Sequence, residues 1–313
     1  MIVEVDGFGN FDLPDVIETD TVTLQNYKET VWHKIDFVAL ERKHPHVTWI
    51  LEDSTYHKQV GNRQRYHHNH PFYFLWHVVW LGLRKLDGDN KHMLASDESD
   101  LGPRQFCFLN NFPRSYRVKL WDRMSDEGLL NEYCSFISRG HLVGGKRENF
   151  VWGQHGHEFS MRPPFFYDSV GADLFVETHP KSPLFFTEKT WKPLFYGKVP
   201  LGFGPRHYYK TLMGLGFKFS KHLDYTFDEL EDTAERFEMF YEQVKHYLSL
   251  PLSLKNDYAD HNKRKCFELL MSSQPAPQDI PEGLIKTKGQ EFLRLGRVLN
   301  PEERDEYWNN SDR

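Results

Sequence analysis

Charged residues near the middle of the chain follow an apolar run and precede a helical pattern. Residues 174–177 (LFVE) predict a buried strand that ends in Glu177, and residues 188–192 (EKTWK) predict the beginning of a helix. In open α/β sheets, ligands bind outside the carboxyl ends of the strands, and lysines near the positive end of a helix suit a bound phosphate. This segment therefore predicts a site for a sugar nucleotide.

Pro193 influences where the predicted helix begins. Inside a helix, proline breaks a backbone hydrogen bond at a cost of about 3 kcal/mol, whereas in the first turn its missing N–H needs no partner. We therefore expect Thr190 to be the N-cap and Glu188 to lie in the approach loop, where its carboxylate accepts hydrogen bonds from ribose hydroxyls. A simple Glu–Lys surface pair is the alternative. The candidate residues of this segment for binding the sugar nucleotide are Thr187, Glu188, Lys189 and Lys192.

A second group of cations follows the apolar run 106–109 (FCFL). Pro113 suits the beginning of a helix, so Arg114 and Arg117 are expected on one face of its first turn. Arginine is unfavourable at the positive end of a helix unless an anion binds there, which makes both residues candidates for binding the sugar nucleotide. A solvated helix face is the alternative, chiefly for Arg114. Arg206, which follows a Gly-rich turn, begins a later helix and is a further candidate.

Carboxylates at strand ends are candidates for a general base. The segment HVTWILEDS predicts a strand that ends in Glu52 and Asp53. The alternative for this pair is a helix N-cap formed by Asp53 or Ser54. Glu177 is the third candidate catalytic residue, and its alternative is an exposed loop charge.

Histidines are concentrated in residues 63–77 (RQRYHHNHPFYFLWH). Zinc ligands usually come in pairs of defined spacing, and no Cys or carboxylate lies close by in this segment, so no metal ligand is assigned. The apolar run 72–83 instead predicts a buried helix or a wide interface. Arg63 and Arg65 are candidates for lining an acceptor cleft, with a solvated loop as the alternative. The histidines that prompt the metal interpretation are His67, His68, His70 and His77.

Length and pattern predict an α/β protein with two domains. The 313 residues exceed what one hydrophobic core commonly serves, and the 39% hydrophobic residues suffice to build cores. The polar, breaker-rich residues 86–104 predict a boundary between domains at 1–100 and 101–272. Strands alternate with helices in the second domain, helical patterns close it, and residues 273–313 suggest a partly ordered tail.

The composition argues against several classes of function. The net charge of −6 argues against an overall electrostatic grip on nucleic acid, and no apolar segment approaches the roughly 18 residues of a membrane span. The first residues (MIVEVDGFGNFDLP) lack the pattern of a secretory signal. Cys107, Cys134 and Cys266 are odd in number and widely spaced, which predicts free thiols in a reducing compartment. We therefore expect a cytoplasmic protein.

Residues 103–271 resemble the donor domain of GT-B glycosyltransferases, with the pattern of the fucosyltransferase-like group and of glycosyltransferases of tailed phages and large viruses. That pattern has a strand ending in Phe-Glu-Asn and then Tyr-Val-Thr-Glu-Lys before a helix, matched by residues 176–178 (VET) and 186–189 (FTEK). Thr178 replaces the usual Asn, and residues 190–193 differ from the helix of the pattern. The pattern's arginine, its Gly-x-x-Pro turn and its late His-Asn are matched by Arg117 or Arg114, by residues 197–200 and by residues 261–262.

The resemblance implies two Rossmann-like domains facing a cleft and a glycosyltransferase that uses a nucleotide-sugar donor and needs no metal or other cofactor. It implies that Arg117 and Lys189 neutralise the diphosphate, that Glu188 holds the ribose and that Glu177 lies near the sugar. The acceptor is expected to be a glycan or another hydroxyl compound, deprotonated by Glu52 or Asp53 in the first domain. A viral origin would place the protein in the host cytoplasm.

Two other functions are alternatives. The first is a viral glycosyltransferase that modifies a hydroxymethylated base in DNA, with the same donor site and a basic acceptor groove. The second is a non-catalytic nucleotide- or sugar-binding module, which would keep the cations but lack a base. The residues expected to form the basic groove are Arg63, Arg65, Arg84 and Lys85.

Overall fold

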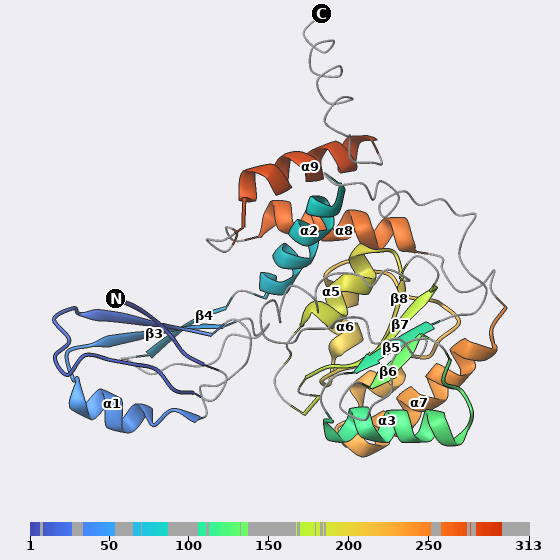
Figure 1. Ribbon diagram of the computed structural model, residues 1–313, viewed down its shortest axis with the longest axis horizontal. Helices are drawn as coiled ribbons and strands as arrows, with labels where there is room; N and C mark the ends of the chain where they lie inside the picture. The colour runs from blue at the N-terminus through green and yellow to red at the C-terminus, as the bar shows by residue number, and fades with distance from the viewer. Residues whose placement is uncertain are drawn as a thin grey trace, which may run out of the picture. The chain divides into compact units, whose positions relative to one another are not determined.

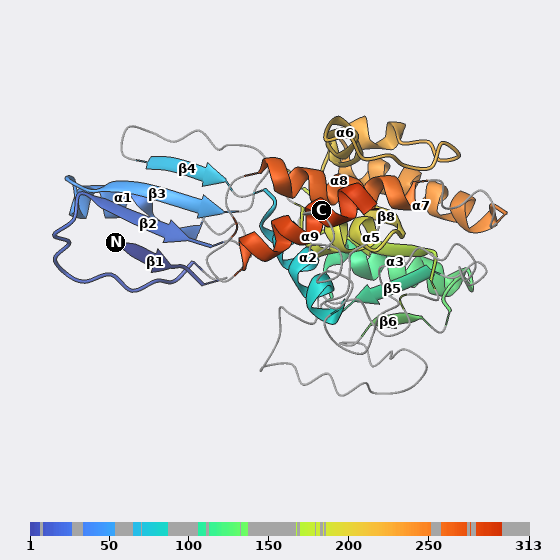
Figure 2. The same ribbon diagram turned by 90° about the horizontal axis from the view of Figure 1, so that it is seen from above.

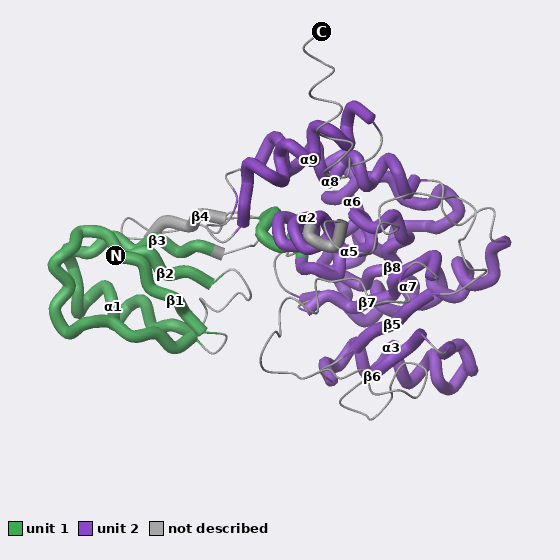
Figure 3. The backbone as a smooth tube through the Cα atoms, turned by 45° about the horizontal axis from the view of Figure 1, so that its top comes forward, with its two compact units in different colours: residues 1–74, 182–186 green, residues 75–181, 187–313 purple. Residues whose placement is uncertain are grey.

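The computed structural model divides the chain into two compact units (Figure 3). Unit 1 comprises residues 1–74 and 182–186, and unit 2 comprises residues 75–181 and 187–313, so the division lies before the expected boundary at 86–104. The structure describes residues 1–6, 9–26, 34–53, 65–69, 71–86, 106–110, 113–131, 133–136, 167, 170–178, 180–181, 184, 186–251, 258–273, 276 and 280–295.

Several sequence-based predictions fall outside these residues. Ser54, Arg63 and His70 are not among the described residues, and the side chains of residues 53, 65–69 and 84–86 are likewise not described. The general base expected at Asp53 and the basic groove are therefore left as predictions.

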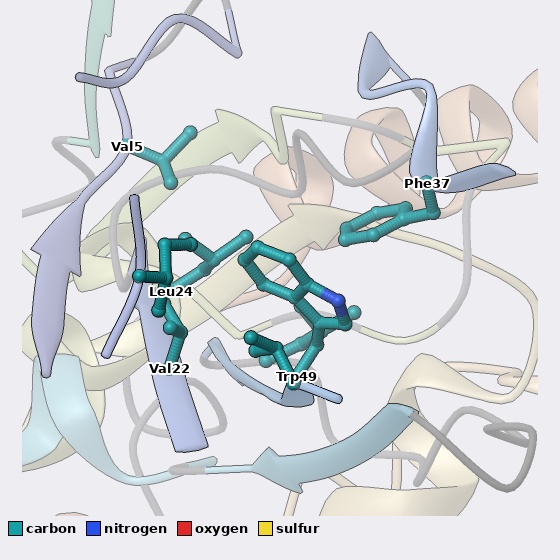
Figure 4. Close-up of a cluster of buried hydrophobic side chains, with 8 residues drawn as sticks. Val5, Val22, Leu24, Phe37 and Trp49 are labelled. Carbon is teal, nitrogen blue, oxygen red and sulfur yellow. The ribbon is translucent and has the colours of Figure 1, made fainter. Parts of the chain in front are cut away.

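Unit 1 contains a parallel sheet whose strands pair in chain order. Its strands and helix are β1 (Ile2–Glu4), β2 (Thr21–Gln25), α1 (Phe37–Lys43), β3 (Thr48–Asp53) and β4 (Arg65–Asn69). Alternate residues of β2 and β3 are buried, which agrees with the two-residue period of a strand. The core of the unit is formed by Val5, Ile17, Val22, Leu24, Phe37, Val47, Trp49 and Leu51 (Figure 4).

The predicted buried helix at 72–83 is α2 (Tyr73–Leu86). From Leu75 onward it belongs to unit 2, where Gly82 lies against two aromatic residues. A Cβ atom at Gly82 would lie 2.6 Å from Cε1 of Phe195 and 2.8 Å from the hydroxyl oxygen of Tyr196. Glycine is therefore required here for close packing.

Unit 2 contains a second parallel sheet with strand order β6-β5-β7-β8. The strands are β5 (Phe106–Asn110), β6 (Cys134–Phe136), β7 (Ala172–Val176) and β8 (Val199–Phe203). α3 (Ser115–Asp126) follows β5, and α5 (Glu188–Phe195) follows β7. This α/β arrangement is compatible with a Rossmann-like fold, and it confirms the predicted strands on either side of the candidate site.

Helices cover both faces of this sheet (Figures 1 and 2). On one face, Trp121 of α3 lies 5.9 Å from Phe108, and Phe237 of α7 (Thr233–Ser249) lies 5.2 Å from Phe203, measured between ring centroids. On the other face, α5 packs through Phe195, whose ring is 5.6 Å from that of Phe267 in α8 (Ala259–Ser272). Aromatic packing therefore holds the layers together.

Helical segments complete unit 2. They are α6 (Tyr208–Gly214), the 3-10 helix η6 (Thr226–Glu229) and α9 (Glu282–Leu295). α9 lies within the stretch expected to be a partly ordered tail, and Phe292 packs 5.0 Å from Phe267. Among the described helices, none combines the length and the apolar character needed to cross a membrane. Cys107, Cys134 and Cys266 are buried and form no disulfide, as predicted.

We expect Gly82→Ala to destabilise the protein by about 1–3 kcal/mol, because the new methyl group overpacks a buried aromatic contact. Helix propensity alone predicts the opposite sign, since alanine is favoured over glycine by about 1 kcal/mol. The free energy of unfolding in urea measures the difference.

Gly283→Ala in α9 is the matched control, because a Cβ atom there has no neighbour within 4 Å. It should leave stability unchanged or raise it by up to about 1 kcal/mol. Equal effects of the two substitutions would contradict the packing described for α2.

Candidate functional site

The order of the strands in unit 2 reverses between β5 and β7. After β5 the chain passes through α3 to β6, and after β7 it passes through α5 to β8 on the other side of the sheet. Because crossovers between parallel strands are right-handed, α3 and α5 lie on opposite faces (Figure 1). The two connections diverge at the carboxyl ends of β5 and β7, and such a switch point is where open α/β sheets bind ligands.

The two candidate arginines lie at this switch point. Arg114 is the N-cap of α3, and Arg117 follows in the first turn. Nη1 of Arg114 donates to the carbonyl oxygen of Thr178 at 3.2 Å, and Nε of Arg117 donates to that of Val176 at 3.4 Å. The chain end of β7 therefore holds both guanidinium groups.

Arg117 is buried with only 6% of its surface exposed, so the solvated-face alternative is wrong for this residue. Burial, followed by the positive charge of Arg114, lowers the pKa of Arg117, while the carboxylates of Glu188 and Glu177 act in the opposite direction. These carboxylates belong to the second charged segment. The fold thus brings the two segments together in one electrostatic environment.

Glu177 joins the end of β7 to the beginning of α5. Oε1 accepts hydrogen bonds from the backbone N–H of Thr187 at 3.1 Å and from the hydroxyl of Thr190 at 2.5 Å. Oε2 accepts from the hydroxyl of Thr187 at 2.7 Å. The side chain is 1% exposed, so an exposed loop charge is excluded. Both carboxylate oxygens accept hydrogen bonds from Thr187 or Thr190, so Glu177 fixes the turn from β7 into α5.

The prediction that Thr190 caps the helix is wrong. α5 begins at Glu188, and Thr187 is its N-cap, with Oγ1 accepting from the backbone N–H of Lys189 at 3.3 Å. The hydroxyl of Thr190 is bound to Glu177 instead, and Pro193 lies inside the helix. The helix extends only two residues beyond the proline and ends at Phe195.

Glu188 and Lys189 form an ion pair at the beginning of α5. Nζ of Lys189 lies 2.6 Å from Oε1 of Glu188 and 3.3 Å from Oγ1 of Thr187. Burial alone would raise the pKa of Glu188, but the charge and hydrogen bond of Lys189 lower it, and the net pKa lies below the ordinary value. The Glu–Lys pair of the alternative is therefore present, but Glu188 is buried rather than on the surface.

Lys192 does not lie with Lys189 at the positive end of the helix, contrary to prediction. It is buried in the last turn, with Nζ 3.6 Å from Oδ2 of Asp173 and 5.5 Å from the ring centroid of Tyr167. Tyr167 donates its hydroxyl to the same carboxylate at 2.7 Å. Lys192 therefore neutralises a buried aspartate of β7.

Arg206 follows β8 and forms hydrogen bonds on the surface of unit 2. Nε donates to the carbonyl oxygen of Glu229 at 2.8 Å, and Nη1 lies 2.9 Å from Oε1 of Glu231. In the part of unit 2 that the structure describes, these hydrogen bonds join Arg206 to the end of η6 and the segment after it and not to Arg117 or Lys189. The candidate binding role of Arg206 is not supported by this geometry.

The remaining candidate carboxylates belong to unit 1. Glu52 lies at the carboxyl end of β3, where Oε2 accepts a hydrogen bond from Nε2 of Gln25 at 2.6 Å. In the register of the sheet, Glu52 of β3 lies opposite His68 of β4. Within the described residues, no group of three or more His, Cys, Asp or Glu side chains is arranged to hold a metal ion.

Sequence analysis missed two buried polar residues at the carboxyl edge of the sheet. Arg236 of α7 donates through Nη2 to the carbonyl oxygens of Pro180 at 2.7 Å and Gly204 at 3.5 Å, so it ties together the segments after β7 and β8. The position of this arginine among the apolar residues of α7 was the signal in the sequence that could have revealed it. Asn110, the last residue of β5, is 4% exposed.

Comparisons of the chain with protein-family models, with curated proteins and with solved structures found no match. The resemblance to GT-B glycosyltransferases therefore rests on the motif residues of this chain.

We expect Glu177→Gln to lower the free energy of unfolding by about 1.5–3 kcal/mol, because an amide nitrogen replaces one acceptor oxygen and leaves a buried donor unpaired. The exposed Glu231→Gln is the control and should change stability by less than about 1 kcal/mol. Urea unfolding of both variants tests this. Equal, small effects would show that Glu177 does not hold the turn.

Asp228 of η6 makes stability depend on pH. Burial raises the pKa of Asp228 from its ordinary 3.8 to about 6, although the backbone N–H groups of Lys210 and Tyr208 and the charges of His207 and Arg236 act against this. A raised pKa means that its contribution to stability is full below about pH 3.8 and is lost as pH rises through about 6.

Between pH 4 and pH 7, the free energy of unfolding of the wild type should therefore fall by about 1–3 kcal/mol relative to Asp228→Asn, which does not titrate. Parallel pH profiles of the two proteins would contradict the raised pKa.

Proposed function

We propose that the protein is a GT-B glycosyltransferase, which moves a sugar from a nucleotide-sugar donor to a hydroxyl acceptor. The proposal is carried by one observation, namely that the two charged segments meet where the strand order of unit 2 reverses. Arg117 donates to the carbonyl oxygen of Val176, and the next residue, Glu177, binds Thr187 at the beginning of α5. Open α/β sheets bind nucleotides at such points, and this agrees with the motif resemblance.

In this proposal the diphosphate of the donor binds between the first turns of α3 and α5. Both helices direct the positive ends of their dipoles and their first backbone N–H groups toward the carboxyl edge of the sheet. Arg117 and Lys189 add full positive charges. Glu188 accepts hydrogen bonds from the ribose hydroxyls, and Glu177 positions the turn that presents Thr187 and Lys189.

The acceptor oxygen forms a bond to the anomeric carbon as the bond from that carbon to the phosphate oxygen breaks. The bonding electrons leave with the nucleoside diphosphate, and the proton of the acceptor hydroxyl passes to a base. Arg117 and Lys189 stabilise the negative charge that develops on the leaving group. The side chains of the protein suffice for this step, which needs no oxidant or reductant.

We assign the acceptor and the base to unit 1. Glu52 is the preferred base because its carboxylate lies at the end of a parallel strand and is oriented by Gln25. Asp53, the next residue, is the second candidate. A glycan or another hydroxyl compound is the proposed acceptor.

Thermal unfolding in the presence of UDP, GDP, CMP and ADP tests the donor site. A nucleotide at 100 times its Kd should stabilise the folded protein by about 2.7 kcal/mol. We expect Lys189→Ala to fold and to weaken binding of that nucleotide about 10- to 100-fold, because one cation is removed from the phosphate.

Lys286→Ala is the matched control, since it also removes an ammonium group from a Glu–Lys pair, here 2.5 Å from Glu282 on α9. It should respond to nucleotides like the wild type. An undiminished response of Lys189→Ala would remove Lys189 from the phosphate site.

Slow hydrolysis of nucleotide-sugars separates an enzyme from a binding module. Transfer activity with UDP- or GDP-sugars should be lost in Glu52→Gln if Glu52 is the base, with nucleotide binding retained. Nucleotide binding without any hydrolysis or transfer would favour the non-catalytic module. Salt-dependent binding to hydroxymethylated DNA would favour a DNA acceptor.

A further inference from the structure

Asn110 carries an unsatisfied hydrogen-bond donor at the candidate site. It is the last residue of β5 and is 4% exposed. Within the part of the chain that the structure describes, Nδ2 of Asn110 has no hydrogen-bond partner. A buried polar group without a partner is unfavourable, and most buried polar groups in folded proteins are bonded. Among the described residues, the amide nitrogen of Asn110 is therefore left to donate to another acceptor.

The position of Asn110 relates it to Arg117. The register pairs Phe108 with Leu174 of β7, so Asn110 and Val176 end their strands at the same level. Arg117 donates to the carbonyl oxygen of that Val176. The ring of Phe108 packs on Trp121 of α3, and the two-residue period places Asn110 on the same face of the sheet. Asn110 and Arg117 thus lie at one corner of the switch point.

This corner contains hydrogen-bond donors and positive charge. α3 is 12 residues long, and its N-cap, Arg114, makes no side-chain capping bond, so the first-turn N–H groups receive no side-chain acceptor from the cap. Arg117 adds a guanidinium group, and Asn110 adds the amide nitrogen. A ligand oxygen with negative charge and several lone pairs satisfies such donors best, and a phosphoryl oxygen has both properties.

We propose that Asn110 is a ligand-binding residue, whose Nδ2 donates a hydrogen bond to a phosphoryl oxygen held beside Arg117 and the first turn of α3. The assignment rests on the proposed nucleotide-sugar function for the identity of the phosphate. Free pyrophosphate has the same phosphoryl oxygens as a nucleoside diphosphate, so the experiment uses both kinds of ligand.

The test compares Asn110→Leu and Asn110→Asp with Asn131→Leu. Leucine removes the donor with little change in volume, and aspartate adds a negative charge in almost the same shape. Asn131 is the matched control because its amide is satisfied, donating to the carbonyl oxygen of Phe106 at 3.0 Å and accepting from the N–H of Tyr133 at 2.8 Å. Calorimetric titration with pyrophosphate, UDP and GDP measures Kd, and thermal unfolding without ligand measures stability.

We expect Asn110→Leu to weaken binding of pyrophosphate, and of the nucleotide that the wild type binds, about 10- to 100-fold. Its melting temperature without ligand should equal or exceed that of the wild type, because an unpaired donor has been removed. Asn110→Asp should bind even more weakly through charge repulsion, and it decides the question if the leucine variant fails to fold. Asn131→Leu should show the reverse, with a lower melting temperature and unchanged Kd.

Wild-type affinity in both Asn110 variants would overturn the assignment, and so would a loss of stability in Asn110→Leu equal to that of Asn131→Leu. If the wild type binds pyrophosphate but neither UDP nor GDP, the nucleotide-sugar function fails while the pyrophosphate titrations still decide the role of Asn110. If the wild type binds none of these probes, both proposals are refuted.

Discussion

The candidate site depends on the buried carboxylate of Glu177. A charge enclosed in a protein is strongly unfavourable unless hydrogen bonds and opposite charge compensate it, so Glu177 requires its donors in fixed places. Thr187 and Thr190 supply those donors and thereby fix the turn from β7 into α5. Thr190 also lies 2.8 Å from the hydroxyl of Tyr208, which extends the network to α6. One side chain thus couples a strand, two helices and the turn that carries Lys189.

The reversal of strand order brings the beginnings of two helices to this network. Adjacent strands β5 and β7 send their chains to opposite faces, so α3 and α5 both begin at the same edge of the sheet. Arg117 and Lys189 reach that edge from different sides of it, and carboxylates of Glu177 and Glu188 keep the buried charge tolerable. Charge compensation of this kind is a requirement of folding, and it also leaves cations beside two positive helix ends.

Predictions from the sequence succeeded where residues close together in the chain carry the signal. Apolar runs predicted the strands near 106–110 and 172–176, and the misplaced charge of Arg117 marked the beginning of α3 as unusual. Prediction failed where a distant residue decides the outcome. Proline rules favoured Thr190 as the N-cap, but Glu177 binds the hydroxyl of Thr190 and leaves the capping to Thr187. Lys192 likewise turns away from the helix beginning because Asp173 is buried beneath it.

The amino-acid sequence by itself determined the α/β class and the two charged segments, because these follow from periodicity and from residue types that are close in the chain. Only the tertiary structure decided that the segments meet, that α9 packs on α8 and that Arg236 and Asn110 belong to the same edge. The physical reason is that hydrogen-bond partners such as Arg117 and Val176 are 59 residues apart in the chain and become neighbours only when β5 pairs with β7, which does not follow it directly in the chain.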